Sequence, residues 1–318
     1  MSGSLSTVPL ASQEFVPGPH LNVNVPNVIE TETTDPQARD GAAIVGSERR
    51  LRPRRTDLVM EWPRVSVVIP TLNEEQNLPH VLTKLPGRLH EVIIVDGFST
   101  DDTLDVARRL RPDAKIVLQG VPGKGDALRC GFEAATGDAL VMLDADGSAD
   151  PAEIPAFVET LMAGADFAKG SRFREGGGSS DITRLRRVGN RGLNGVVNGL
   201  FRTAYSDLCY GYNAFWRHCL GPMSIDCTGF EVETLINIRI ARAGLEIHEV
   251  PSFERDRIHG QSNLRTFRDG GRVLRTILRE RARKKPYTEA VIHPNKAVLH
   301  RTDEELTSSR GVVSAELA

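Results

Sequence analysis

Two aspartates separated by a single residue are the clearest candidates for chemistry in this chain of 318 residues. Asp144 and Asp146 directly follow the apolar run 139–143, which has the composition of a buried strand, and a glycine comes next. Because side chains alternate along an extended chain, both carboxylates lie on the same side of the exit turn. Two carboxylates so placed can hold one hard divalent cation against a diphosphate group. A lone pair of this kind is also compatible with a loop that carries two solvated aspartates.

Other predicted strands end at the same edge of the molecule. Residues 65–71 (VSVVIPT) and 91–96 (EVIIVD) are continuous apolar runs of the length expected for strands buried on both faces. Similar patterns predict four further elements, the strands 114–118 and 139–143 and the helices 103–110 and 126–136. Alternating strands and helices predict a parallel sheet, in which ligands bind beyond the carboxyl ends of the strands. Pro70, Asp96 and Asp144 therefore converge on one crevice.

The composition narrows the class of protein. With 40% hydrophobic and 26% charged residues the chain can bury a substantial core, and a net charge of -2 indicates no bulk attraction to nucleic acid. The four cysteines form no C-x-x-C pair and no zinc spacing, which favours reduced thiols over disulfides. No run approaches the ~20 apolar residues needed to span a bilayer, and the first residues lack a signal-peptide core. We expect a cytoplasmic protein.

Both ends of the chain have the composition of disordered tails. Residues 1–61 mix Ser, Pro, Thr, Gly and Asn with little periodicity and finish near the basic run ERRLRPRR, while residues 286–318 are polar and weakly patterned. Such segments bury too little apolar surface to offset the entropy that is lost on ordering. The folded unit is therefore predicted to be a single domain over residues 62–285.

Four motifs in this domain, VVIPTLNEE, EVIIVDGFSTDDT, GKGDALRCGFEAATGDALVMLDADGS and GSRF, together resemble the family 2 glycosyltransferases. Their order is most similar to that of the dolichyl- or polyprenyl-phosphate sugar transferases within this family. The resemblance implies an α/β fold of the GT-A (Rossmann-like) type, a mostly parallel sheet flanked by helices. It divides the domain into a nucleotide-sugar-binding half (62–150), an acceptor half (151–265) and a basic amphipathic helix (266–285).

The activity that the resemblance implies is metal-dependent transfer of a hexose, with inversion, from a GDP- or UDP-hexose. Asp144 and Asp146 would hold Mg²⁺ or Mn²⁺, with Ser148 as a weaker third ligand. Asp96 would hydrogen-bond the base edge, and Gly97 stands where many relatives have a second aspartate. The implied donor-binding residues are Pro70, Thr71, Leu72, Glu74, Asp96, Lys124, Asp144, Ala145, Arg172 and Arg257. Taken singly, several of these residues are also typical of turns and helix starts.

On the acceptor side, the resemblance implies that Arg186 and Asn190 contact a phosphate, a role that suits the guanidinium fork of arginine. A solvated basic helix face is the alternative for such arginines. Asp207 is the carboxylate nearest to being a general base and thus the third catalytic candidate, although it could equally cap a turn. Glu231 and Glu233 are weaker candidates, because the helical spacing around them predicts exposed glutamates.

The residues leave the acceptor open. A lipid-linked acceptor, polyprenyl phosphate, is favoured because a phosphate is already an anion at neutral pH and needs charged partners more than a base. The alternatives are a hydroxyl on a glycan or small metabolite, and a nucleotide-sugar-binding protein without turnover. The basic segment 266–285 is predicted to lie on an anionic membrane surface, which would make the protein peripheral at the inner face, or to dock on its own domain.

Overall fold

The structure of the protein is a computed structural model, in which residues 61–261 and 266–283 are described. The disorder expected for residues 1–61 and 286–318 falls outside the described part of the chain, apart from Glu61. Among the described helices, none is both long enough and apolar enough to cross a membrane.

A seven-stranded sheet forms the centre of the fold, in the order β3-β2-β1-β4-β7-β5-β8. β7 runs antiparallel to both of its neighbours, and the other strand pairs of this sheet are parallel, which confirms the mostly parallel sheet predicted from the sequence. β6 pairs with β9 in a second, two-stranded sheet. The strands are β1 (Val65–Thr71), β2 (Glu91–Asp96), β3 (Lys115–Leu118), β4 (Ala139–Met142), β5 (Phe167–Ser171), β6 (Gly178–Ser179), β7 (Asn213–Trp216), β8 (Ile247–Pro251) and β9 (Phe253–Glu254).

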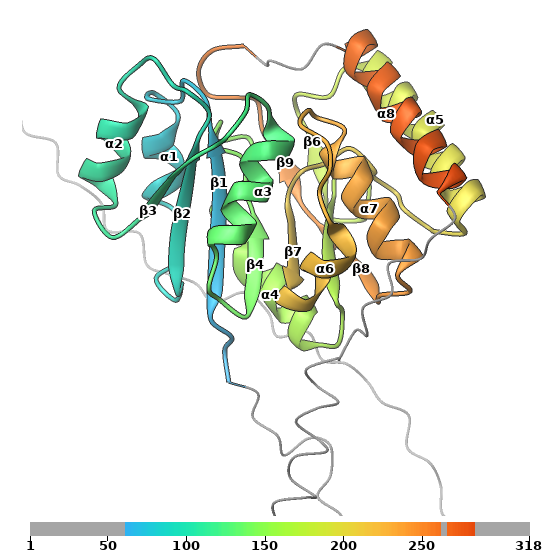
Figure 1. Ribbon diagram of the computed structural model, residues 1–318, viewed down its shortest axis with the longest axis horizontal. Coiled ribbons are helices and arrows are strands. Elements are labelled where there is room, and N and C mark those ends of the chain that lie inside the picture. Colours follow the sequence, from blue (N-terminus) through green and yellow to red (C-terminus); the bar gives the residue numbers. More distant parts are fainter. Residues whose placement is uncertain (1–60, 262–265, 284–318) are drawn as a thin grey trace, which may run out of the picture. The chain divides into compact units, whose positions relative to one another are not determined.

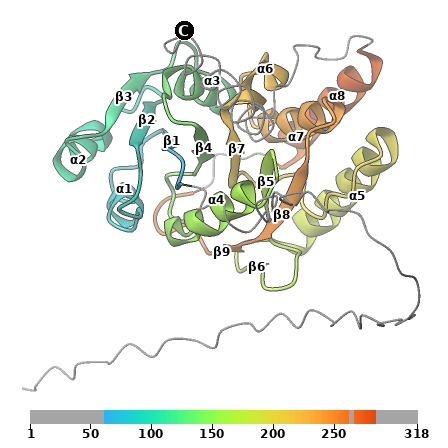
Figure 2. The ribbon, with the colours of Figure 1, turned by 90° about the horizontal axis from the view of Figure 1, so that it is seen from below.

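Helices cover both faces of the large sheet (Figure 1; Figure 2). α1, α2 and α4 pack on one face, and α3, α6 and α7 pack on the other. Within β1, Val67 and Ile69 face the first group and Val68 faces the second, as the two-residue period of a strand requires. The helices are α1 (Leu78–Leu82), α2 (Thr103–Leu110), α3 (Lys124–Ala134), α4 (Ile154–Met162), α5 (Arg184–Phe201), α6 (Leu220–Met223), α7 (Val232–Arg242) and α8 (Thr266–Ala282).

The strand register brings the carboxyl ends of β1, β2 and β4 to one edge of the sheet. Thr71 at the end of β1 pairs with Asp96 at the end of β2, and β4 joins β1 on its other side. The helix predicted over 126–136 begins two residues earlier, because Gly123, with a φ of 129°, makes the turn directly before it. This earlier start brings Lys124 into the first turn of α3, at the same edge of the sheet.

α5 and α8 lie side by side at the β8 end of the large sheet (Figure 1). Val273 and Ile277 of α8 belong to a third apolar core, to which α5 and α7 also contribute. A fully buried ion pair reinforces the contact between α7 and α8, with Arg239 Nη2 2.8 Å from Glu280 Oε1. α8 therefore docks on its own domain, which was one of the two arrangements expected for this segment.

Candidate active site

A cavity of about 850 Å³ opens at the carboxyl ends of β1, β2 and β4 and continues to a part that α5 and α8 line. Two of the predicted site residues, Asp96 and Asp207, do not line this cavity. The others do: Pro70, Thr71, Leu72, Glu74, Lys124, Asp144, Ala145, Asp146, Ser148, Arg172, Arg186, Asn190 and Arg257.

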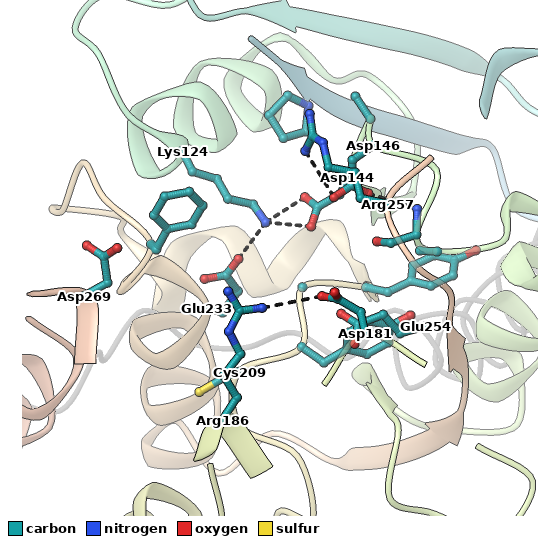
Figure 3. A pocket seen from close by; sticks show the side chains of 18 of the residues that line it. Lys124, Asp144, Asp146, Asp181, Arg186, Cys209, Glu233, Glu254, Arg257 and Asp269 are labelled. Carbon is teal, nitrogen blue, oxygen red and sulfur yellow. Dashed lines mark hydrogen bonds and ion pairs between the residues drawn. The ribbon is translucent and has the colours of Figure 1, made fainter. Parts of the chain in front are cut away.

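Lys124 joins two acidic side chains across the cavity (Figure 3). Its Nζ lies 2.6 Å from Asp144 Oδ1 and 2.7 Å from Glu233 Oε1. Burial opposes the charge on Lys124, but the two carboxylates outweigh burial and raise the pKa of Lys124. The sequence pattern predicted an exposed Glu233, whereas this side chain is buried and lines the cavity. No local signal distinguishes it from Glu231, because its partner comes from a distant part of the chain.

Arg257 links Asp146 to Glu74. Its Nη1 lies 3.4 Å from Asp146 Oδ2, and its Nη2 lies 2.6 Å from Glu74 Oε1. Asp146 also accepts a hydrogen bond of 3.0 Å from the backbone N–H of Ser148. Burial raises the pKa of Glu74, an effect that hydrogen bonds from Asn77 and Arg257 reduce. Both aspartates of the D-x-D pair are therefore paired with a basic side chain.

Asp207 is fully buried behind the cavity wall. Arg172 donates to both of its oxygens, with Nε 2.7 Å from Oδ2 and Nη2 2.9 Å from Oδ1, and Asn190 Nδ2 donates to Oδ1 at 2.9 Å. Burial would raise the pKa of Asp207, but Arg172 and Lys169 hold that pKa below its usual range. A base needs access to the proton that it removes. The position of Asp207 therefore does not fit the predicted base role and instead fixes Arg172 and Asn190.

Asp96 ends β2 beside the cavity without lining it. Its Oδ2 accepts hydrogen bonds of 3.1 Å from the backbone N–H groups of Phe98 and Ser99. Its Oδ1 is buried, with no hydrogen-bond partner among the residues that the structure describes. The carboxylate thus organises the loop after β2, in which Gly97 does line the cavity. The contact of Asp96 with a base edge stays a prediction.

The part of the cavity near α5 and α8 has both apolar and charged side chains, the charged ones being Asp181, Arg186 and Asp269. Ile182, Leu185, Leu193, Phe230 and Val273 contribute their side chains to it. Leu185 is exposed, so this apolar lining continues to the outer surface. The cavity thus has two chemically different regions. One, at the strand ends, is charged, and the other, beside the two helices, combines these apolar side chains with Asp181, Arg186 and Asp269 and is called the apolar region below.

Arg186 has a weaker partner than the other cavity arginines. Its Nη1 lies 3.5 Å from Asp181 Oδ2 (Figure 3), a contact at the limit of a hydrogen bond. Arg172, by contrast, is held by Asp207 and also lies 2.9 Å from Glu254 Oε2. Arg186 is therefore the cavity arginine with the most freedom to contact an anionic group.

The carboxylate oxygens of Asp144 and Asp146, which follow β4, are suitable ligands for a hard divalent ion. Asp144 and Asp146 are both partly exposed and line the same cavity, and carboxylate oxygens are the ligands that Mg²⁺ and Mn²⁺ prefer. No cluster of three or more His, Cys, Asp or Glu side chains suited to a metal occurs in the described ranges. Two carboxylates would thus leave further coordination positions to Ser148, substrate oxygens and water.

Comparison with known proteins supports this interpretation at the level of sequence. Residues 66–220 match the family model "Glycosyl transferase family 2". Glycosyltransferase AglJ of Haloferax volcanii is 30% identical over 225 residues, which cover 70% of this chain and 73% of that protein. An uncharacterized glycosyltransferase of Mycobacterium tuberculosis is 44% identical over 113 residues, 36% of this chain and 50% of that protein.

Solved structures support the fold. Glucosyl-3-phosphoglycerate synthase from Mycobacterium tuberculosis, in complex with phosphoglyceric acid, has a TM-score of 0.56 and 25% identity, and the match covers 70% of this chain and 81% of that one. The same enzyme in complex with Mn²⁺, UDP-glucose and phosphoglyceric acid has a TM-score of 0.54 and 25% identity, with the same coverage of 70% and 81%. The family model, the relative from Haloferax volcanii and these structures agree with the motifs and the GT-A fold. The chain therefore belongs to glycosyltransferase family 2 and is a glycosyltransferase enzyme.

Proposed function

We propose that the protein transfers a hexose from a nucleoside diphosphate sugar, with inversion, to the phosphate of a polyprenyl phosphate. The observation that carries this proposal is the division of one cavity into a charged region at the strand ends and an apolar region lined by α5 and α8. A sugar nucleotide is fully polar, whereas a polyprenyl phosphate has an anionic head and a hydrocarbon chain. The two regions suit these two substrates.

The charged region supports a metal-assisted donor site. Asp144 and Asp146 are the proposed ligands of Mg²⁺ or Mn²⁺, which neutralises charge on the diphosphate leaving group when it is bound. Lys124 and Arg257 hold these two carboxylates at the cavity wall and remain within reach of an anionic substrate. The complex of the synthase from Mycobacterium tuberculosis with Mn²⁺ and UDP-glucose is consistent with this assignment.

The acceptor region supports a nucleophile that is already charged. Arg186 and Asn190 line the cavity between its charged and apolar parts, and a guanidinium group pairs well with phosphate. Of the acidic residues that line the cavity, Asp181 and Glu254 each contact an arginine, whereas Asp256 is exposed and has no ion pair among the described residues, so it is the candidate base for the alternative hydroxyl acceptor. A hydroxyl acceptor would need a carboxylate that is free to take a proton. A phosphate acceptor requires only positioning and charge compensation.

The outer surface beside the apolar region supports binding at a membrane. α5 and α8 expose Leu185, Val188, Leu274 and Leu278, and the same two helices carry exposed arginines, among them Arg184, Arg187, Arg191 and Arg275. Apolar side chains among basic ones are typical of a helix surface that contacts anionic lipid headgroups. This surface would bring the cavity to a lipid-linked acceptor at the inner face of the membrane.

The acceptor is tested by measuring sugar transfer from UDP- and GDP-hexoses, with Mn²⁺, to polyprenyl phosphate in detergent and to phosphoglycerate. We expect transfer to the lipid phosphate, and a drop of at least about tenfold in Leu185→Glu, because a carboxylate disfavours both the hydrocarbon chain and the phosphate. Val196→Glu is the matched control, since Val196 is exposed on the same helix but does not line the cavity. Transfer to phosphoglycerate with none to the lipid would contradict the proposed acceptor.

Membrane binding is tested separately with vesicles. The full chain should sediment with phosphatidylglycerol vesicles and not with phosphatidylcholine vesicles, and added salt should release it, because the attraction is electrostatic. Changing Arg184, Arg187 and Arg191 to Glu should abolish sedimentation. Arg279 and Arg283 are unsuitable for this purpose, because both contact Asp226 and help to hold α8. Undiminished binding by the triple variant would exclude this surface.

A further inference from the structure

Lys124 is shared between one aspartate of the D-x-D pair and a second carboxylate (Figure 3). Its Nζ lies between Asp144 and Glu233, at 2.6 Å from an oxygen of the first and 2.7 Å from an oxygen of the second. A Cβ atom built on Gly211 would lie 3.1–3.3 Å from one charged atom of each of these three side chains. The absence of a side chain at Gly211 therefore leaves the room in which the three charged groups meet.

Arg257 is shared in the same way at the other aspartate. Its Nη1 lies 3.4 Å from Asp146 Oδ2, and its Nη2 lies 2.6 Å from Glu74 Oε1. In both groups the glutamate is the more buried carboxylate, because the side chains of Glu74 and Glu233 are 9% and 7% exposed, whereas those of Asp146 and Asp144 are 23% and 36% exposed. Each cation thus has one buried partner and one partner that is open to the cavity.

The charges of these six side chains do not cancel. Lys124 and Arg257 together balance the D-x-D pair, and the two glutamates add further negative charge. Without Glu74 and Glu233, a divalent ion would enter a site whose charge the two cations already neutralise. With them, the site keeps an excess of negative charge and attracts a divalent cation.

We propose that Glu233 and Glu74 are positioning residues that free the D-x-D pair for the metal, an inference that rests on the metal-assisted donor site proposed above. The two aspartates must give up their basic partners before their oxygens bind a divalent ion. Each cation then keeps its glutamate, so that neither is left unpaired where water solvates it poorly. Lys124 and Arg257 thereby stay at the cavity wall, within reach of an anionic donor.

Binding of Mn²⁺ alone to the full chain tests this inference without sugar transfer. The free ion is measured by electron paramagnetic resonance. Glu233→Gln leaves Lys124 on Asp144, so the dissociation constant for Mn²⁺ should rise about tenfold, and Glu74→Gln should act likewise through Arg257. Glu231→Gln is the matched control, since it removes the same charge from a residue that does not line the cavity. It should change the constant by less than about twofold.

Double variants identify the cation that each glutamate serves. Lys124→Met added to Glu233→Gln removes the competing cation, so Mn²⁺ should bind at least as tightly as to the wild type. Arg257→Met should rescue Glu74→Gln in the same way. When the second substitutions are exchanged between the two glutamate variants, the effects should add to within about twofold, because no ion pair joins the crossed residues in the described structure. A glutamate that only supports the fold would show no such rescue.

The outcomes distinguish this inference from the proposed function. Wild-type protein that binds Mn²⁺ neither alone nor with UDP would overturn both, and this result appears before any variant is made. Wild-type binding that the folded glutamate variants retain would overturn only the role of the glutamates. Equal rescue by matched and crossed substitutions would also overturn it, because the glutamates would then act through net charge alone. Thermal unfolding confirms that each variant is folded, and if Glu233→Gln does not fold, Glu74→Gln and its two double variants decide the question.

Discussion

Asp144 and Asp207 lie close to the same cavity and each pairs with a basic side chain, yet their surroundings differ. The side chain of Asp144 is 36% exposed and contacts the single ammonium group of Lys124, whereas the side chain of Asp207 is 0% exposed. Asp207 receives two bonds from the guanidinium group of Arg172 and one from Asn190. A carboxylate of the first kind can exchange its partner for a metal ion. One of the second kind is a fixed part of the cavity wall.

The difference follows from solvation and from the number of hydrogen bonds. A partly exposed ion pair is worth little, because water competes for both charges and the side chains lose entropy when they pair. Breaking a buried pair leaves an uncompensated charge in a medium that solvates it poorly. The two aspartates should therefore respond to mutation in opposite ways, one through activity and the other through stability.

The largest effect on activity is expected at the two proposed metal ligands, Asp144 and Asp146. Asp146→Asn should lower sugar transfer by about 10³-fold or more, because an amide does not replace an anionic ligand of a hard cation. The free energy of unfolding should change by less than about 1 kcal/mol, since the contact with Arg257 is long and partly exposed. Transfer assays over a range of Mn²⁺ concentrations and urea unfolding measure the two quantities. Asp138→Asn, in an exposed pair with Arg64, is the matched control and should retain activity.

Retention of near-native turnover by Asp146→Asn at all metal concentrations would exclude the metal role of this residue.

The buried pair should show the reverse. Asp207→Ala should lower the free energy of unfolding by about 3–5 kcal/mol, because it leaves the Arg172 charge with one carboxylate fewer and Asn190 without its acceptor. Asp144→Ala should cost less than Asp207→Ala, since the mostly buried Lys124 ammonium keeps Glu233 as a partner. Urea unfolding of both variants under the same conditions makes the comparison. Equal destabilisation by the two substitutions would remove the distinction between the pairs.

Arg186 allows the same comparison, between weakly and firmly held side chains, for the arginines of the cavity. Its contact with Asp181 is 3.5 Å long, so it is free to bind an acceptor phosphate. Arg186→Ala should lower transfer to polyprenyl phosphate by about 30-fold or more through a higher acceptor KM, because a charge-assisted contact of about 2 kcal/mol or more is lost. Release of nucleotide from the donor in the absence of acceptor should be unchanged. Steady-state kinetics with both substrates varied tests this. A dominant effect on the donor KM would instead assign Arg186 to the donor region.

The smallest effect concerns Lys169, a fully buried lysine near the buried pair of Asp207 and Arg172. Its Nζ donates to the carbonyl oxygens of Gly170 and Tyr210, and burial lowers the pKa of Lys169 from 10.5 to about 8. The charges of Asp207 and Glu249 oppose this shift, as does Cys209, and that of Arg172 adds to it.

Between the folded pKa and the unfolded pKa of Lys169, the unfolded chain binds more protons, so the free energy of unfolding rises with pH in this window. Below a pH of about 8 the cost of burying the charge is fully present. The stability of the wild type relative to Lys169→Met should therefore increase by about 1–2 kcal/mol from neutral pH to about pH 9.5. Urea unfolding of both proteins over this pH range gives the difference, in which the titration of the cysteines cancels. A constant difference would show that Lys169 does not titrate there.

Much of the fold was predictable from the sequence because its signals are local. The bounds predicted for β1, β2 and α2 match the structure, since each is defined by a continuous apolar run or by helical spacing. The D-x-D pair was found for the same reason, as two polar residues directly after a strand. The antiparallel direction of β7 was not predicted, because strand direction depends on how distant segments pair.

The amino-acid sequence by itself determined the alternation of strands and helices and the residue types that reach the carboxyl edge of the sheet. Only the tertiary structure decided which of these residues face the cavity. It buried Asp207 behind Arg172, joined Glu233 to Lys124 and turned Asp96 to its own loop. These contacts join segments far apart in the chain. Their burial and partners therefore depend on how whole helices and strands pack, which no local pattern specifies.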